Sequence, residues 1–286
     1  MASATRDQVQ RAAMLASVSG RSFEDIKFWA FSRRSYTGVV DKPLPLLANS
    51  GLLHKVTDHF KFVLSTGFAE GGIVEMESPF PSTRSSSSDM YDYASDSDLE
   101  DEDEDDFEGV SQDENSDDGK EHKEEGSGIG RNVAAIRKPG RVVHVEDVAY
   151  HTLKAFIFWA YYEEINFAPL KSQQKMLPTE QNAYNAPFCS PKSMYRLAHR
   201  YDVPRLKELA LNDIRSKLTH ENILEELLSN FTMLYPDVRN IEIQFLRTCM
   251  NQETIRRRLP SWIEAMEKGE LPRGAAGVVS ALLGCA

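Results

Sequence analysis

Residues Asp147–Ile165, DVAYHTLKAFIFWAYYEEI, decide the fold of this chain. From Ala155 to Tyr162 every residue is apolar or aromatic. A helix that is apolar on all faces is buried on all faces, so the stretch predicts a helix inside a domain, with the rest of the chain packed around it. The apolar run is too short to span a membrane, and Lys154 and Glu163 bracket it.

Charge is unevenly distributed along the 286 residues, of which 41% are apolar. The net charge of −11 arises in residues 89–125, which hold 19 of the 44 acidic residues and 2 of the 33 Lys and Arg. The other residues carry 25 acidic and 31 basic side chains, a net charge of +6. The composition therefore predicts one domain with extensions, in which a mildly basic body carries an acidic segment.

The cysteines Cys189, Cys249 and Cys285 are far apart and include no CxxC pair. This usage disfavours a disulfide framework and a zinc site, and it predicts an intracellular location, in the nucleus or the cytoplasm. No run of about 18 apolar residues is present, so we expect no transmembrane helix.

Residues 7–18 predict a helix within an amino-terminal segment, residues 1–22. The apolar residues on one face of this helix are Val9, Ala13 and Ala16. A weak transit peptide is the alternative, since two arginines flank an Ala-Met-Leu-Ala run, but Asp7 is unusual in such a peptide.

The next elements are two predicted strands and a helix. Residues 25–32 combine partial alternation with dense aromatics, which favours a strand covered on both faces. Residues 37–47 suit a second strand, and Pro43 and Pro45 place it at an edge or a strand start. Residues 49–65 carry apolar side chains at helical spacing and predict a helix.

The composition changes at Gly71 and returns to that of a folded domain near residue 142. Residues 81–130 are rich in Ser, Asp, Glu and Gly, and such a segment buries too little surface to offset its ordering entropy. We therefore expect a disordered insertion over about 71–141. Residues 142–145 then predict a strand leading into the central helix.

Beyond the central helix, residues 165–167 predict a short strand and residues 171–189 a loop. The remaining chain is helical, with a hydroxyl cap and a first-turn proline at Ser190-Pro191. The predicted helices begin near Ser190, Asp202, Thr219, Val238 and Ile255. We expect Pro260 to interrupt the last of them.

Two stretches resemble the BTB/POZ domain family. Residues Ala48–Phe60, ANSGLLHKVTDHF, align without a gap to its A-H-K-x-x-L-x-x-x-S-x-x-F segment. Residues 147–165 align in the same way to its D-V-S-x-x-x-F-x-x-L-L-x-x-I-Y-T-G-E-I segment. Residues 25–28 are similar to the opening strand of the family and residues 194–218 to its closing helix pair. The general character of the amino-acid sequence resembles that of fungal BTB proteins.

The resemblance implies an α+β fold, a short-stranded mixed sheet flanked by helices. The BTB/POZ domain would cover residues 23–218, with the acidic insertion between two of its elements and a helical extension at 219–286. A long insertion of this kind costs little free energy, because closure entropy grows only as the logarithm of length. Residues 1–47 would supply a helix and a strand for homodimerisation, as in long-form members.

In several BTB dimers a charged groove holds partner peptides. The opening aspartate and a histidine of the family help to line it, and they correspond to Asp25 and Asn49 here. Asp25 and Asn49 are therefore groove and dimer candidates, although Asn49 carries no charge and weakens the case for this kind of capture.

Phe68-Ala69-Glu70 matches a hydrophobic-x-Glu motif with which some BTB proteins bind the cullin scaffold of a ubiquitin ligase. An exposed apolar side chain beside a carboxylate can anchor a helix groove and fix its register. The alternative is that Phe68 caps the core and Glu70 is solvated.

Ser95 and Ser97 each have an acidic residue three positions later, Asp98 and Glu100. This spacing suits a kinase that prefers acidic surroundings, and each phosphate would add about −1.5 to −2 of charge. The alternative is an unmodified segment that only increases solubility.

Catalytic constellations are not visible in the sequence. The glycines of GSGIG at residues 126–130 follow no strand, and the seven histidines form no ligand cluster. Arg256–Arg258 lacks an aromatic stacking platform, which favours a solvated helix face over nucleic-acid binding. We expect no enzyme, metal, cofactor, membrane or nucleic-acid partner.

Two functional hypotheses remain. The first is a BTB-type protein–protein interaction adaptor that recruits substrates to a cullin-RING ubiquitin ligase. The second is a transcription or chromatin regulator that self-associates through its BTB domain and engages basic partners with its acidic tract.

Overall fold

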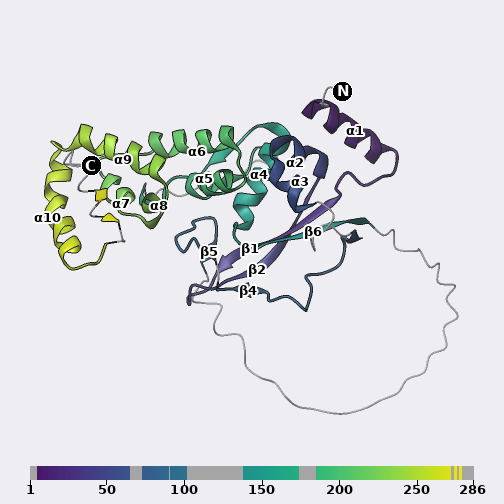
Figure 1. The fold of residues 1–286 in the computed structure, drawn as a ribbon, viewed down its shortest axis with the longest axis horizontal. Helices are drawn as coiled ribbons and strands as arrows, with labels where there is room; N and C mark the ends of the chain where they lie inside the picture. Colours follow the sequence, from purple (N-terminus) through teal and green to yellow (C-terminus); the bar gives the residue numbers. More distant parts are fainter. Residues whose placement is uncertain are drawn as a thin grey trace, which may run out of the picture.

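Strand β1 (Ile26–Arg34) lies inside the main sheet, whose strand order is β3-β6-β1-β2-β4. The computed structural model describes residues 5–64, 73–89, 91–101, 138–173, 185–271, 274–275 and 277–278. β2 (Val40–Ala48) pairs antiparallel with β1, and β6 (Pro139–Val145) pairs parallel on the other side, with Val143 opposite Phe28. The apolar regions before and after residues 102–137 therefore share one sheet, and the fold is α+β (Figure 1).

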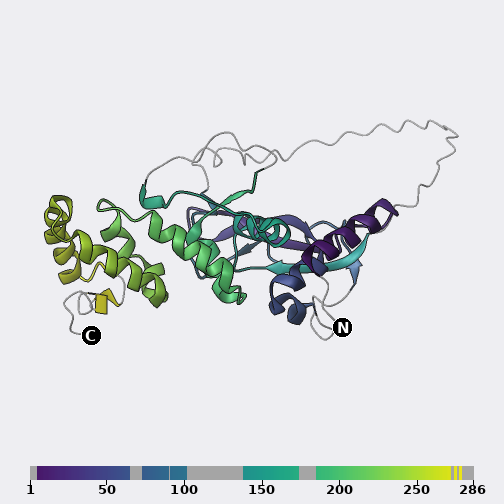
Figure 2. The same ribbon diagram turned by 90° about the horizontal axis from the view of Figure 1, so that it is seen from above.

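Helix α4 (Tyr150–Tyr162) is the central helix that the sequence predicts. It lies over the sheet in Figure 2, and its Phe156 ring lies 5.9 Å from those of both Phe60 and Tyr201. Burial on all faces is confirmed for the middle of the helix but not for Lys154 and Tyr162, which are exposed. The apolar segments on the two sides of the insertion thus meet in one core.

The predicted helix at 49–65 is two helices, α2 (Ser50–Val56) and α3 (Asp58–Val63). Thr57 between them is extended, with φ −152°, and its hydroxyl oxygen accepts a hydrogen bond from the His59 amide. The same hydroxyl donates to the Tyr201 carbonyl, which ties the break to the loop after α5 (Pro191–Arg200). The Thr57 side-chain cap therefore interrupts the helix, although the apolar spacing in the sequence continues across the break.

Disorder is the wrong prediction for residues 73–89 and 91–101, which we name the cover segment. Its short strands pair with the main sheet: β3 (Val74–Glu75) with β6, β4 (Ser87–Ser88) with β2, and β5 (Glu100–Asp101) with β1. Its buried apolar side chains are Met76, Tyr93 and Leu99. The most acidic part of the predicted insertion, residues 102–137, lies outside the described residues.

The cover segment is ordered because β1 is apolar on both faces, as the sequence predicts. Phe28 points toward the helices, whereas Trp29 and Phe31 point to the opposite face. There Phe80 packs edge-on against Trp29 at 5.2 Å, and Leu99 packs with Phe31. Burying these rings offsets the entropy of ordering a polar segment.

The prolines of β2 lie at a sheet edge, as predicted. Only Val40 and Asp41 of β2 pair with β4. Within the described chain, the outer edge of the rest of β2 has no partner strand, so the missing amide hydrogens of Pro43 and Pro45 cost the sheet nothing.

After α6 (Pro204–Ser216) the chain forms the carboxy-terminal extension. Its helices are α7 (Ile223–Leu227), α8 (Asn230–Leu234), α9 (Pro236–Cys249) and α10 (Glu253–Glu267). The predicted third helix is thus two short helices, and α10 continues through Pro260, so the predicted interruption is wrong. The extension has its own apolar cluster, around Leu224 and Leu246, while Phe231 and Val238 belong to the main core.

The predicted strand at 165–167 is β7 (Asn166–Phe167), which pairs with β8 (Phe188–Cys189). The loop predicted at 171–189 begins with the short helix η3 (Lys171–Gln173). Helix α1 (Arg6–Val18) forms as predicted, with a capping box at Thr5 and Gln8, and none of its residues is buried. No described helix combines the length and the apolar character needed to cross a lipid bilayer.

We predict that Phe156→Ala lowers the free energy of unfolding by about 3 to 5 kcal/mol, because it leaves a cavity where the two apolar segments meet. Chemical denaturation followed by tryptophan fluorescence measures the change. Phe62→Ala is the matched control, since this ring is 65% exposed and its loss should cost less than about 1 kcal/mol. Equal effects of the two variants would contradict a shared core.

Candidate functional site

Asp25 and Asn49 lie together at the start of α2, as their alignment predicts. The Asp25 carboxylate accepts hydrogen bonds from the amide (2.6 Å) and the hydroxyl (2.5 Å) of Ser50. Asn49 caps α2 by accepting from the Leu52 amide at 3.3 Å, and its side-chain amide donates to the Phe23 carbonyl at 2.7 Å. Both side chains therefore have a structural role in capping a helix.

Helix α1 packs against this capped end of α2. A Cβ atom placed on Gly51 of α2 would lie 3.1 Å from the Val9 side chain of α1, so glycine permits the close approach. Arg6 of α1 forms an ion pair with Glu163 at the end of α4, and Arg205 of α6 binds the same carboxylate at 2.5 Å. Together these contacts hold one side of α1 on the body.

The other side of α1 carries apolar side chains into solvent. The exposed apolar residues are Met14, Leu15 and Val18, and Val18 is 84% exposed. They line a shallow hollow with the polar residues Asp7, Gln10 and Arg11. An apolar patch rimmed by polar side chains is typical of a protein interaction surface.

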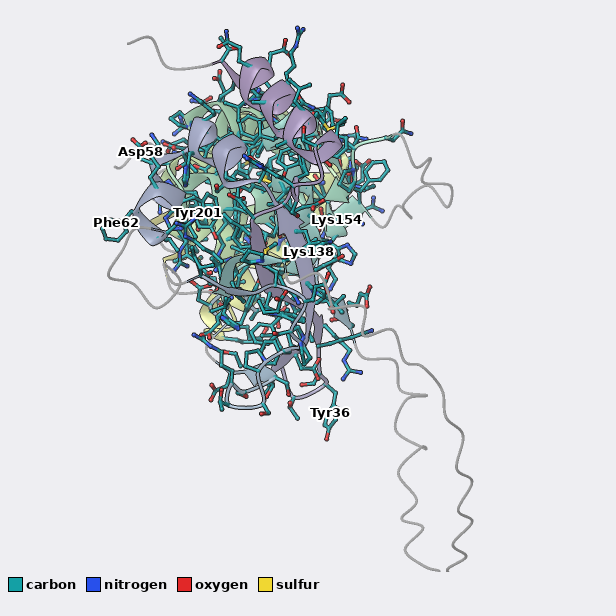
Figure 3. All side chains as sticks on the ribbon, turned by 90° about the vertical axis from the view of Figure 1, so that its right-hand side faces the viewer. Tyr36, Asp58, Phe62, Lys138, Lys154 and Tyr201 are labelled. Atoms are coloured by element: carbon teal, nitrogen blue, oxygen red, sulfur yellow. The ribbon has the colours of Figure 1, made fainter. Side chains whose placement is uncertain are left out.

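Helix α3 presents another exposed apolar side chain, Phe62. Its ring points away from the body in Figure 3, near the labelled Asp58 and at the border of a hollow that includes Tyr201. His59 stacks on Tyr201 at 4.2 Å, and burial lowers the pKa of His59. Phe62 is not among the residues predicted from the sequence, although an aromatic residue off the apolar stripe of its helix could have indicated it. Phe68 and Glu70 lie outside the described residues.

Ser95 and Ser97 are exposed, while Asp96 and Asp98 between and after them are buried. The acidic residue three positions after Ser95 is the buried Asp98, whereas Ser97 has the exposed Glu100 at this position. Of the two predicted phosphorylation sites, only Ser97 keeps its acidic determinant accessible. Phosphorylation of either residue stays a prediction.

Asp96 and Asp98 point into the body from the cover segment. The Thr152 hydroxyl of α4 and the Ser190 amide at the start of α5 both donate to the Asp98 carboxylate. Burial and the neighbouring Asp96 charge raise the pKa of Asp98 to about 7. The acidic composition of this segment gives no indication of these contacts. The aromatic residues Tyr91 and Tyr93 within the acidic tract do indicate packing.

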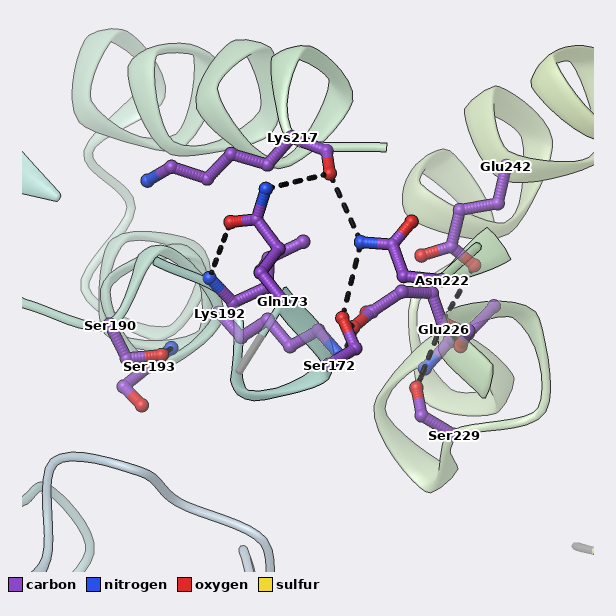
Figure 4. Close-up of polar contacts among 12 residues, drawn as sticks. Ser172, Gln173, Ser190, Lys192, Ser193, Lys217, Asn222, Glu226, Ser229 and Glu242 are labelled. Atoms are coloured by element: carbon purple, nitrogen blue, oxygen red, sulfur yellow. Dashed lines mark hydrogen bonds and ion pairs between the residues drawn. The ribbon is translucent and has the colours of Figure 1, made fainter. Parts of the chain in front are cut away.

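A buried polar cluster joins the body to the carboxy-terminal extension (Figure 4). Asn222 donates to the Ser172 hydroxyl at 3.2 Å and to the Lys217 carbonyl at 3.1 Å. The Glu226 carboxylate accepts from Ser172 at 2.5 Å and forms an ion pair with Lys192 of α5. Hydrogen bonds require a particular distance and direction between their atoms, so this cluster fixes the orientation of the extension relative to the body.

Glu242 of α9 is buried beside this cluster. The Thr232 hydroxyl oxygen lies 2.8 Å from Glu242 Oε2 and 2.9 Å from the Glu226 carbonyl oxygen. A hydroxyl has one hydrogen to donate, so when it donates to the carbonyl, a protonated Glu242 carboxyl can donate to the hydroxyl oxygen. Burial raises the pKa of Glu242 to about 8, in agreement with a protonated carboxyl.

Cys189 and Cys249 are buried, and burial raises the pKa of both thiols, which leaves them poor nucleophiles. No group of three or more His, Cys, Asp or Glu side chains in the described part of the chain could hold a metal ion. Arg256, Arg257 and Arg258 are exposed on α10.

No protein-family model matches the chain, and a search of curated proteins also finds no match.

We predict that Glu242→Gln stabilises the fold increasingly as the pH rises from about 4.5 to 8. The raised pKa means that the folded state holds a proton which the unfolded state releases, so the wild type loses stability across this window. The variant has no such proton, and at pH 8 it should gain about 1 to 3 kcal/mol. Thermal unfolding at several pH values measures this gain.

Glu208→Gln, at an exposed position of α6, is the control and should leave the pH dependence of unfolding unchanged. A pH-independent difference between Glu242→Gln and the wild type would contradict a protonated Glu242.

Proposed function

We propose that this chain is a non-enzymatic protein–protein interaction module of the BTB type. The observation that carries the proposal is the solvent-facing apolar side of α1, a helix held on the body by its other side. We infer that a second copy of the chain covers this side and forms a homodimer. Burying the patch would supply the apolar core that such an interface needs.

The arrangement of the stretches that resemble BTB/POZ segments supports this assignment. They lie on β1, on α2 with α3, on α4, and on α5 with α6. All of these elements contribute side chains to one core, and the cover segment and the extension are joined to it. The proposed BTB/POZ domain thus corresponds to residues 23–218, with the insertion between α3 and β6.

The adaptor hypothesis adds a cullin scaffold as the partner. The Phe68-Ala69-Glu70 motif follows α3, on which Phe62 is exposed. An apolar anchor beside a carboxylate would suit a helix groove on the scaffold. The helices of the extension would then contribute to substrate recruitment.

The alternative function is that of a transcription or chromatin regulator. The observation that favours it is the run of acidic residues at 102–106, which would attract basic partners. Affinity purification distinguishes the two functions, because association with a cullin favours the adaptor and DNA-independent association with chromatin favours the regulator.

We predict that Leu15→Glu/Val18→Glu converts a dimer into a monomer, because two charges would be buried in the proposed interface. Light scattering coupled to size-exclusion chromatography measures the mass, and the dissociation constant should rise at least 100-fold. Gln244→Glu adds a charge at an exposed position of α9, outside this patch, and should leave the dimer intact. A wild-type monomer at concentrations of tens of micromolar would contradict self-association.

We predict that Phe68→Ala abolishes co-purification with a cullin and leaves the unfolding temperature unchanged, because it removes the proposed apolar anchor. Phe62→Ala, the loss of a neighbouring exposed ring, should retain binding. Unchanged recovery of the cullin with Phe68→Ala would refute the motif assignment.

A further inference from the structure

Residues 91–101, which we name the acidic strap, are held by the body in the way that a protein holds a peptide ligand. The four carboxylate oxygens of Asp96 and Asp98 each accept a hydrogen bond. The donors to Asp96 are the hydroxyls of Ser193 (2.6 Å) and Tyr91 (2.6 Å) and the Asp98 amide (2.9 Å). The donors to Asp98 are the Ser190 amide (2.7 Å) and the Thr152 hydroxyl (2.6 Å). The donors from Ser193, Ser190 and Thr152 belong to the body, and those from Tyr91 and Asp98 belong to the strap itself.

The body side of this contact consists of buried donors on two helices. The side chains of Thr152, Ser190 and Ser193 are almost fully buried. Thr152 comes from α4, whereas Ser190 and Ser193 form the first turn of α5, a helix of 10 residues. Amides at the start of a helix and buried hydroxyls are neutral donors that suit an anionic side chain.

Two apolar side chains bracket the aspartates of the strap. Tyr93 is buried with its ring 5.8 Å from that of Phe231, and Leu99 packs with Phe31. The strap therefore presents the pattern Y-x-x-D-x-D-L to the body, with Ser95 and Ser97 pointing to solvent.

The backbone of the strap is also bound. Strand β5 adds to β1 in parallel, with Asp101 opposite Arg34. The Arg34 guanidinium donates to the Asp96 carbonyl at 2.8 Å. Strand addition combined with pockets for alternate side chains is a common mode of peptide recognition.

The chemistry of the contact favours exchange over permanent burial. Three hydroxyls and two amides donate to the two carboxylates, while the nearby Arg196 guanidinium binds Asp92 instead. Such neutral donors only partly offset the cost of removing the two carboxyl groups from water.

We propose that the groove between β1, α4 and the first turn of α5 is a binding site for acidic peptides with an Asp-x-Asp-Leu motif, and that residues 96–99 fill it in cis. This inference rests on the proposed function and names the chemistry of its partner. A tethered segment competes at an effective concentration in the millimolar range, so the strap acts as an internal inhibitor.

The probe is a fluorescein-labelled synthetic peptide with the sequence of residues 89–101. In the full-length chain, Asp96→Lys/Asp98→Lys places two cations opposite buried donors and expels the strap. Fluorescence anisotropy should give saturable binding of the peptide to this variant, and at least 100-fold weaker binding to the wild type. A peptide with asparagine at both aspartate positions should bind at least tenfold more weakly.

A matched receptor variant tests the groove itself. Thr152→Val/Ser193→Ala, added to the expelled-strap variant, removes two donors with little change in volume and should weaken peptide binding at least tenfold. An expelled-strap variant that keeps its far-ultraviolet circular dichroism and fails to bind the peptide would overturn the proposal.

If the double lysine variant does not fold, the near-isosteric Asp98→Asn takes its place. The wild type is then also titrated to several millimolar peptide, where exchange with the tethered strap must become saturable, and its absence overturns the proposal. Peptide binding needs no second copy of the chain, so its failure is distinguishable from failure of the α1 dimer.

Discussion

Strand β1 imposes a constraint on which the rest of the structure depends, because both of its faces must be shielded from water. Phe28 faces the helices, and the ring of Phe60 lies 5.6 Å from it. Trp29 and Phe31 face the other way and are buried only because the cover segment lies on them. Even Lys27 on this outer face is buried, and it donates to the Met76 and Ser78 carbonyls of the cover segment. A three-layer body follows from one strand that is apolar on both sides.

The sequence predicts elements well where spacing alone identifies a buried face. The central helix, the strand at residues 25–32 and the helix pair after Ser190 all form where expected. The two-sided burial of β1 and the disorder of the cover segment are conflicting predictions, and the structure shows burial. Composition fails here because a few anchors, among them Tyr93 and Leu99, order a segment that is polar on average.

The candidate site is less predictable, since its contacts join elements that are distant in sequence. Asp25 and Asn49 come together as the alignment expects, but their role in capping α2 is a local detail that no spacing reveals. The partners of Asp98 come from two elements, and nothing near Thr152 or Ser190 in the sequence identifies either as its donor. Lys192 and Glu226 likewise meet only because the extension folds back on α5.

The buried polar cluster at the base of the extension has a mechanical consequence. Apolar contacts alone tolerate small shifts between two packed parts of a protein. The directional hydrogen bonds among Ser172, Asn222 and Glu226 instead fix the angle between the body and the extension. Helix α1 and helix α10 lie at opposite ends of the elongated molecule in Figures 1 and 2. Two copies joined through α1 would therefore form a rigid dimer with the two carboxy-terminal extensions at its far ends. Any partners bound to the two extensions would be held at a constant distance from each other.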